Sequence, residues 1–200
     1  GAGITYLTVI SGGTLTVTNE IEFIGNGGSL HIDGGTVNHT GTSMTFGSNV
    51  NRYVEMTSGN FTTNANISLN GGNTTQPGFS LGNGTANFNG DLTVSSSNKR
   101  FDAGSGTINV SGDLTVGQSS IFNLGTATLT VDGTTTVNGD FNGDDGTAIF
   151  DGPANIVSNG ELNLNSGNLV FNSTLDVEGN AYAYLGSGTV DINSDVQVQS

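Results

Sequence analysis

Oxygen-bearing side chains at alternate positions mark one short segment as a candidate cation site. Asp140, Asn142 and Asp144 offer carboxylate and amide oxygens two residues apart, which is how the ligands of calcium loops are spaced. The match is partial, because Asp145 stands where such loops have glycine and Asp151 replaces the bidentate glutamate of the twelfth position. Asp140, Asn142 and Asp144 are therefore the candidate metal ligands, and we expect no cofactor other than calcium.

The segment that carries these residues, Asn138–Gly146, also has a simpler interpretation. Its sequence, NGDFNGDDG, is rich in turn-forming residues and keeps only Phe141 from the apolar pattern described below. We expect a solvated acidic turn here, with calcium binding as the alternative.

Paired carboxylates suggest a second chemistry, glycoside hydrolysis. Asp91 and Asp113 occupy equivalent positions in two consecutive repeats of the sequence, so we expect them to stack. Hydrolase sites also bring basic side chains to the same face, whereas this chain has only Arg52, Lys99 and Arg100 as cations, and its two histidines are distant from Asp113 in the repeat. No nucleophile, metalloprotease or phosphate-loop motif is present. We therefore expect no catalytic residues. A polysaccharide-active enzyme ranks third among the possible functions, after a non-catalytic structural role and a glycan- or calcium-binding module.

Two irregular places in the repeat are candidates for binding. His39 and Thr63 fall on positions that are apolar in the other repeats. We expect a bulge that turns both side chains outward, and a small polar pocket is the alternative. The loop Asn70–Gly78, NGGNTTQPG, is the longest turn-like stretch, and it could carry a glycan or be a tolerated insertion.

These residues belong to a repeated phrase. GTANFNGDLTV (84–94), GTINVSGDLTV (106–116) and GTVDINSDVQV (188–198) are three of about nine copies, spaced roughly 19 to 25 residues apart. Self-similarity at this period is typical of a solenoid.

Each copy contains three short stretches in which apolar and polar residues alternate, as in strands with one buried face. The first stretch buries pairs such as Ala86 and Phe88 or Ile108 and Val110, and the second buries pairs such as Leu92 and Val94. The third stretch is weaker, with Phe101 and Ala103 as one example.

Three strands in each turn of about 21 residues predict an all-β fold, a parallel β-helix of about nine rungs that forms one domain over residues 1–200. Parallel crossovers favour the right-handed form. At about 4.8 Å per rung, the rod would be roughly 40 Å long. We expect glycine and asparagine at the corners because tight turns require positive φ angles.

Composition excludes several classes of protein. Glycine is abundant, with 33 residues, but lacks the strict spacing of collagen, and apolar residues make up 33% of the chain in a regular pattern, unlike a disordered chain. A net charge of −14 with three basic residues argues against nucleic acid as a partner. No apolar run is long enough to insert into a membrane. The absence of cysteine fits an extracellular bacterial protein.

The phrases GGTLTV, SGDLTV and SGTINVSGDLTV resemble the glycine-rich repeats of bacterial secreted β-helix proteins. These include filamentous-haemagglutinin-like adhesins, autotransporter passengers and the repeat adhesins of Bacteroidetes. The resemblance covers nearly the whole chain, but it lies in the kind of residues and in the repeat length, and it includes no diagnostic motif. It implies a non-enzymatic structural rod at the bacterial cell surface or in the secreted fraction, with host or surface glycans as candidate partners. No binding residue carries over from the resemblance.

Both ends of the chain continue the repeat without a capping segment. Open strand edges and an open core invite pairing with further rungs. We therefore expect the partner to be either neighbouring repeats of a longer chain or a second copy stacked end to end, which would build a filament.

Overall fold

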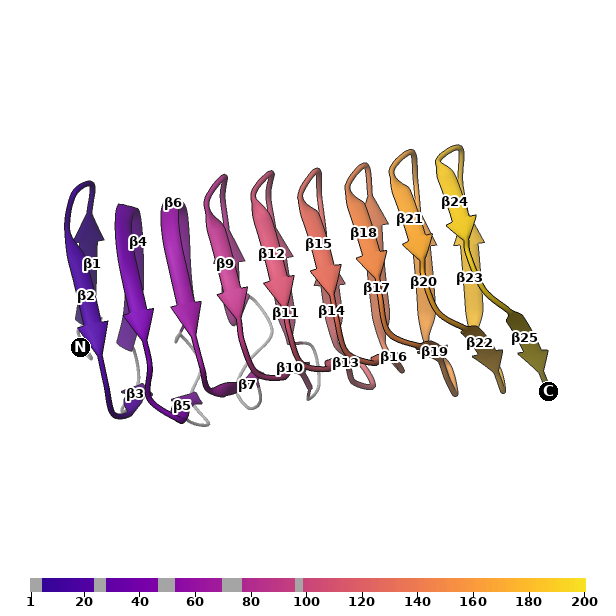
Figure 1. The fold of residues 1–200 in the computed structure, drawn as a ribbon, viewed down its shortest axis with the longest axis horizontal. Helices are drawn as coiled ribbons and strands as arrows, with labels where there is room; N and C mark the ends of the chain where they lie inside the picture. The colour runs from indigo at the N-terminus through magenta and orange to yellow at the C-terminus, as the bar shows by residue number, and fades with distance from the viewer. Residues whose placement is uncertain (1–4, 24–27, 47–52, 70–76, 96–98) are drawn as a thin grey trace.

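The chain folds as a parallel β-solenoid of about eight turns, with about 21 residues per turn. The computed structural model describes residues 5–23, 28–46, 53–69, 77–95 and 99–200, and these contain strands and turns but no α-helix. Successive turns lie side by side along one axis, and the N- and C-terminal rungs lie at opposite ends (Figure 1). The predicted fold class is confirmed, and the handedness stays a prediction.

Each turn passes through three strands, which form three faces of the rod. The chain runs along the third-strand face, reverses at a tight corner into the first-strand face, and then crosses to the second-strand face (Figure 1). Two long strands, β4 (Gly28–His39) and β6 (Tyr53–Thr63), run through that corner without a break and therefore belong to both the third-strand and the first-strand face.

The strands of the three faces have the following bounds. The third-strand face contains β1 (Thr5–Ile10), β8 (Phe79–Leu81), β11 (Arg100–Ala103), β14 (Ile121–Asn123), β17 (Asp140–Asp144), β20 (Glu161–Leu164) and β23 (Tyr182–Leu185). The first-strand face contains β2 (Thr14–Val17), β9 (Thr85–Phe88), β12 (Thr107–Val110), β15 (Thr128–Val131), β18 (Thr147–Phe150), β21 (Asn168–Phe171) and β24 (Thr189–Ile192). The second-strand face is a nine-stranded sheet of β3 (Ile21–Phe23), β5 (Ser43–Phe46), β7 (Asn66–Leu69), β10 (Leu92–Val94), β13 (Leu114–Val116), β16 (Thr135–Val137), β19 (Ala154–Ile156), β22 (Leu175–Glu178) and β25 (Val196–Gln199).

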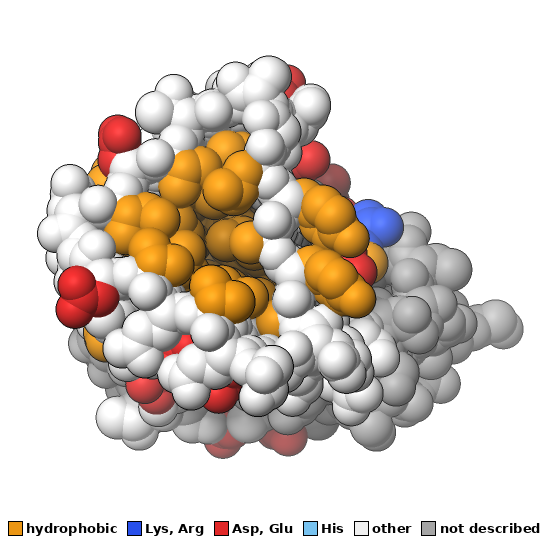
Figure 2. Space-filling model, turned by 90° about the vertical axis from the view of Figure 1, so that its right-hand side faces the viewer, with side chains coloured by type: hydrophobic (Ala, Val, Ile, Leu, Met, Phe, Trp, Pro, Cys, Tyr) orange, Lys and Arg blue, Asp and Glu red, His pale blue; other side chains and the backbone are white. Residues whose placement is uncertain are grey.

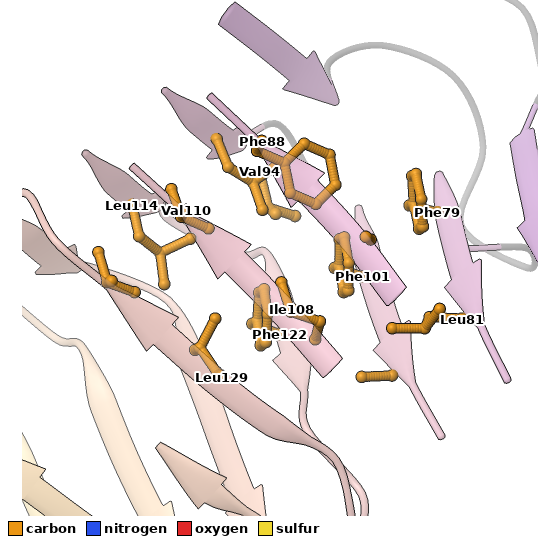
Figure 3. Close-up of a cluster of buried hydrophobic side chains, with 14 of the residues drawn as sticks. Phe79, Leu81, Phe88, Val94, Phe101, Ile108, Val110, Leu114, Phe122 and Leu129 are labelled. Carbon is orange, nitrogen blue, oxygen red and sulfur yellow. The ribbon is translucent and has the colours of Figure 1, made fainter. Parts of the chain in front are cut away.

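Strict register between rungs stacks like residues on one another. Phe101 lies beside Phe79 on one side and Phe122 on the other, and all three rings are buried. The rings are parallel, with centroids 5.0 Å apart for the first pair and 4.7 Å apart for the second. Figure 3 shows these side chains pointing into the interior between the faces. The alternation seen in the sequence therefore produces one continuous apolar core along the axis.

At the corner between the third- and first-strand faces, several rungs need glycine because of a close approach between rungs. A Cβ atom on Gly106 would lie 2.2 Å from the carbonyl oxygen of Gly84, and one on Gly188 would lie 2.0 Å from that of Gly167. Five of the described glycines have positive φ, and four of them, Gly12, Gly34, Gly59 and Gly125, lie at this corner, so the positive-φ explanation drawn from the sequence holds in those rungs. Gly106 and Gly188 do not have positive φ, and there the neighbouring rung leaves no room for a side chain.

Candidate functional site

The third-strand face carries a ladder of side-chain amides on its outer surface. Asn123 donates to Asp102 Oδ1 at 2.7 Å, Asn142 donates to Asn123 Oδ1 at 2.8 Å, and Asn163 donates to Asn142 Oδ1 at 3.1 Å. Each residue lies directly beside the next in the register of β11, β14, β17 and β20. An amide has two N–H groups and a carbonyl with two lone pairs, so each member of the ladder retains bonding capacity toward solvent.

The segment expected to be a solvated acidic turn is instead a strand. Residues Asp140–Asp144 form β17, which pairs with both neighbouring rungs, and the pairing shifts by one residue after Asn142. The expectation was wrong because both neighbouring rungs pair with this segment and hold it as a strand, and the shift in pairing lies at Gly143. After this bulge Asp144 takes a positive φ of 47°, and its carboxylate accepts from the backbone N–H of Gly125 at 3.3 Å.

The three candidate calcium ligands have different surroundings in this strand. Asp140 and Asn142 lie on its outer side, where the amide of Asn142 is bound within the ladder, while the carboxylate of Asp144 points to a neighbouring corner. In the part of the chain that the structure describes, no group of three or more His, Cys, Asp or Glu side chains is arranged to hold a metal ion. Calcium binding by Asp140, Asn142 and Asp144 stays a prediction.

Asp140 has a perturbed carboxyl group. Burial raises its pKa above the usual value, and the carboxylate of Glu161 on the next rung raises it further. Both groups lie on the outer side of adjacent strands, in direct register. Of the described cations, Arg100 is hydrogen-bonded through Nε to Asp102 Oδ2 at 3.2 Å, and Lys99 is buried, which lowers its pKa.

The stacked carboxylates Asp91 and Asp113 have a structural role. Asp91 Oδ1 accepts from the backbone N–H of Asp113 at 3.0 Å, and Asp113 Oδ1 accepts from that of Thr134 at 2.8 Å. One rung earlier, Asn66 Oδ1 accepts from the backbone N–H of Asp91 in the same way, at 3.0 Å. Each of these side chains accepts a hydrogen bond from a backbone N–H group of the next rung, at the same corner. This structural role explains why Asp91 and Asp113 stack, with no need for a catalytic one.

His39 and Thr63 remain inside the core, so the predicted outward bulge is wrong. They lie in register with each other, are 1% and 0% exposed, and are joined by a 2.9 Å hydrogen bond between His39 Nδ1 and Thr63 Oγ1. His39 Nε2 lies 2.7 Å from the carbonyl oxygen of Asn19, to which it donates, and Thr63 Oγ1 accepts from Ala65 N–H at 3.1 Å. Burial is tolerated because every polar atom has a partner.

Gly41 makes room for this buried pair. A Cβ atom at that position would lie 1.6 Å from the carbonyl oxygen of Asn19 and 2.7 Å from His39 Nε2. The polar cluster therefore depends on contacts between residues about one repeat apart, and we assign it a structural role.

Two tyrosines form the largest outward aromatic surface among the described residues. Tyr182 and Tyr184 of β23 are 52% and 55% exposed, and their rings are stacked with centroids 5.8 Å apart and an interplanar angle of 16°. They lie beside Glu161 and Asn163 of β20. This pair was not recognised from the sequence. The signal was present, since the inward positions of Ala183 and Leu185 imply that the alternate residues, Tyr182 and Tyr184, point outward.

The remaining candidate, the loop Asn70–Gly78, falls largely outside the described residues, which resume at residue 77. No helix among the described residues has the length and apolarity needed to cross a membrane. Comparisons with protein-family models, with curated proteins and with solved structures find no match to this chain.

Proposed function

We propose that this chain is a structural rod of a bacterial cell-surface adhesin or extracellular fibre, with no catalytic role. The observation that carries the proposal is the continuity of order along the axis. Leu92 N–H donates to the carbonyl of Asp113 at 2.8 Å, and Leu114 N–H repeats this bond to Thr134 at 2.9 Å one rung further on. Ladders of this kind, with the stacked apolar core, make a stiff body whose contacts run from each rung to the next.

Composition supports an extracellular location. The chain has no cysteine that could mispair during export through an oxidising compartment. Its net charge of −14 keeps such a rod soluble and apart from other copies along its sides. The resemblance of its repeats to those of secreted bacterial β-helix proteins points the same way.

The partner that we propose is a further rung, supplied by neighbouring repeats or by a second copy of the chain. At the C-terminal end Leu185, Val196 and Val198 occupy inward positions but are 52%, 50% and 79% exposed. At the other end Leu7 is 54% exposed, although its register partner Leu30 is buried. Figure 2 shows hydrophobic side chains gathered inside the polar rim at the C-terminal end. A rung stacked there would cover them.

Sedimentation velocity over a range of concentrations tests the self-stacking form of this proposal. Val198→Asp places a charge in the open core, and Gln197→Asp places the same charge on the outer side of the same strand. We expect the sedimentation coefficient of the wild type and of Gln197→Asp to rise with concentration, whereas Val198→Asp stays monomeric. A wild-type chain that stays monomeric at every concentration, or equal effects of both substitutions, contradicts self-stacking. Release of reducing sugars from polysaccharides would contradict the non-catalytic role.

A further inference from the structure

The two exposed tyrosines lie at one end of a polar surface that spans several rungs. Tyr182 and Tyr184 project from the outer side of β23, so a further rung stacked on this strand would leave their outward surface in water. Exposed aromatic rings that lie together are uncommon on a soluble surface unless a ligand or partner covers them. In the end view, side chains of the hydrophobic class, which includes tyrosine, are seen outside the rim of the core (Figure 2).

Two columns of polar side chains run up to these rings. Glu161 lies beside Tyr182 in register, with Asp140 on the rung before it. Asn163 lies beside Tyr184 and is the last amide of the ladder. Because each amide in the ladder donates to the rung before it, the carbonyl oxygen of Asn163 faces the rung of the tyrosines. The surface thus combines aromatic rings, carboxylates and amides within three rungs.

The carboxylates of this surface lack a cation of their own. In the described part of the chain, no basic side chain lies within ion-pair distance of Asp140 or Glu161, while Arg100 is paired with Asp102. The two carboxylates lie on adjacent rungs and repel each other. A positively charged group bound between them would relieve this repulsion, and tyrosine rings attract cations through their faces.

We propose that this surface binds an amino-sugar polymer, a glycan that carries free amines. We call the surface the tyrosine face, and it consists of Asp140, Asn142, Glu161, Asn163, Tyr182 and Tyr184. Sugar rings pack against the tyrosines, protonated amines lie against the carboxylates, and hydroxyl groups hydrogen-bond with the amides. A cationic peptide fits less well, because it could add as a strand only along the free edge of β23, whereas β17 and β20, which carry the carboxylates, are paired on both sides. The proposal goes beyond the structural role and does not depend on self-stacking.

Isothermal titration calorimetry of the whole chain with defined oligosaccharides tests the ligand class. The probe is a hexamer of β-1,4-linked glucosamine, at a pH where its amines are protonated, and the control is the corresponding N-acetylglucosamine hexamer. We expect saturable binding of the free-amine hexamer. The acetylated hexamer should bind at least about ten-fold more weakly, because it loses one or two charge contacts. Absence of binding, or equal affinity for both sugars, overturns the proposal.

Variants locate the binding surface. Tyr182→Ser combined with Tyr184→Ser is expected to weaken binding by about ten-fold or more, and Glu161→Gln by several-fold. Asp191→Asn is the matched control, because it removes one exposed carboxylate from β24 on the first-strand face. Unchanged far-ultraviolet circular dichroism and melting temperature verify that each variant is folded.

Two outcomes with these variants would overturn the assignment. Equal weakening by Glu161→Gln and Asp191→Asn would show general attraction to an acidic protein. Binding of a lysine hexamer with the same affinity and the same dependence on the tyrosines would show that the ligand is a cationic peptide.

Discussion

Removing one ring from the phenylalanine stack is the sharpest test of the core. Phe122 in β14 is fully buried, and its ring lies parallel to those of Phe101, 4.7 Å away, and Phe141, 5.2 Å away. Phe122→Ala removes the ring from the middle of the rod and breaks both stacked contacts. The strands on either side, β11 and β17, hold β14 by backbone hydrogen bonds, so the neighbours cannot close the gap.

The magnitude follows from these contacts. Truncation of a buried phenylalanine to alanine costs about 3–5 kcal/mol, with the larger values at sites that cannot collapse. Each aromatic pair contributes about 0.5–1.5 kcal/mol beyond burial alone, and Phe122 takes part in two. We therefore expect the free energy of unfolding to fall by about 5 kcal/mol. Such a loss is a large fraction of the stability of an ordinary domain, which is about 5–15 kcal/mol.

Urea denaturation followed by circular dichroism and by sedimentation measures this loss, and coincident transitions verify that unfolding is two-state. The matched control is Ile121→Ala, which shortens the preceding residue on the outer side of the same strand. We expect this control to cost about 1 kcal/mol, since its side chain is only partly buried. Equal losses for Phe122→Ala and Ile121→Ala would contradict the inward position of Phe122 and the outward position of Ile121 in β14.

Three further predictions concern polar groups in the core and on the third-strand face. His39→Ala should destabilise the chain by about 2–4 kcal/mol in urea denaturation, because it opens a cavity and removes the partner of Thr63 Oγ1 and of the Asn19 carbonyl. His39→Leu should cost less, since it loses the same hydrogen bonds but fills most of the cavity; equal losses for the two variants would contradict the buried position of the ring. Thr135→Val should raise the free energy of unfolding by about 1–2 kcal/mol, because the buried hydroxyl of Thr135 has no described hydrogen-bond partner. Thr136→Val, on the outer side of the same strand, should change the free energy of unfolding little. No gain from Thr135→Val would show that the hydroxyl is hydrogen-bonded. Asp140→Asn should stabilise the chain at neutral pH, because the raised folded-state pKa of Asp140 means that its ionisation destabilises the folded chain. The gain should disappear below the unfolded-state pKa of 3.8, where the carboxyl group is protonated in both states. A gain that is the same at all pH values would contradict this.

The solenoid and its register could be predicted from sequence because both depend on local alternation. Residues such as Leu92 and Val94 alternate with polar neighbours, and this pattern alone separates inward from outward side chains. The same pattern placed Phe101 in the core, and it also implies the outward position of Tyr182 and Tyr184, which was not recognised from the sequence.

The errors arose where a side chain depends on another rung. Burial of His39 requires the carbonyl of Asn19 and the hydroxyl of Thr63, which lie about one repeat away on either side. The strand at Asp140–Asp144 forms because neighbouring rungs pair with it, although its own composition favours a turn. Corner glycines such as Gly106 are required by a carbonyl of the preceding rung, and local backbone preference alone does not reveal that contact.

Negative-stain electron microscopy over a range of concentrations tests the proposed structural role most directly. If rungs stack between molecules, which is the self-stacking form of the proposal, the purified chain should form unbranched fibres of uniform width that lengthen with concentration, and Val198→Asp should remain as short particles. Fibres of the Val198→Asp variant, or only short particles and irregular aggregates of the wild type, would contradict end-to-end assembly through the open core.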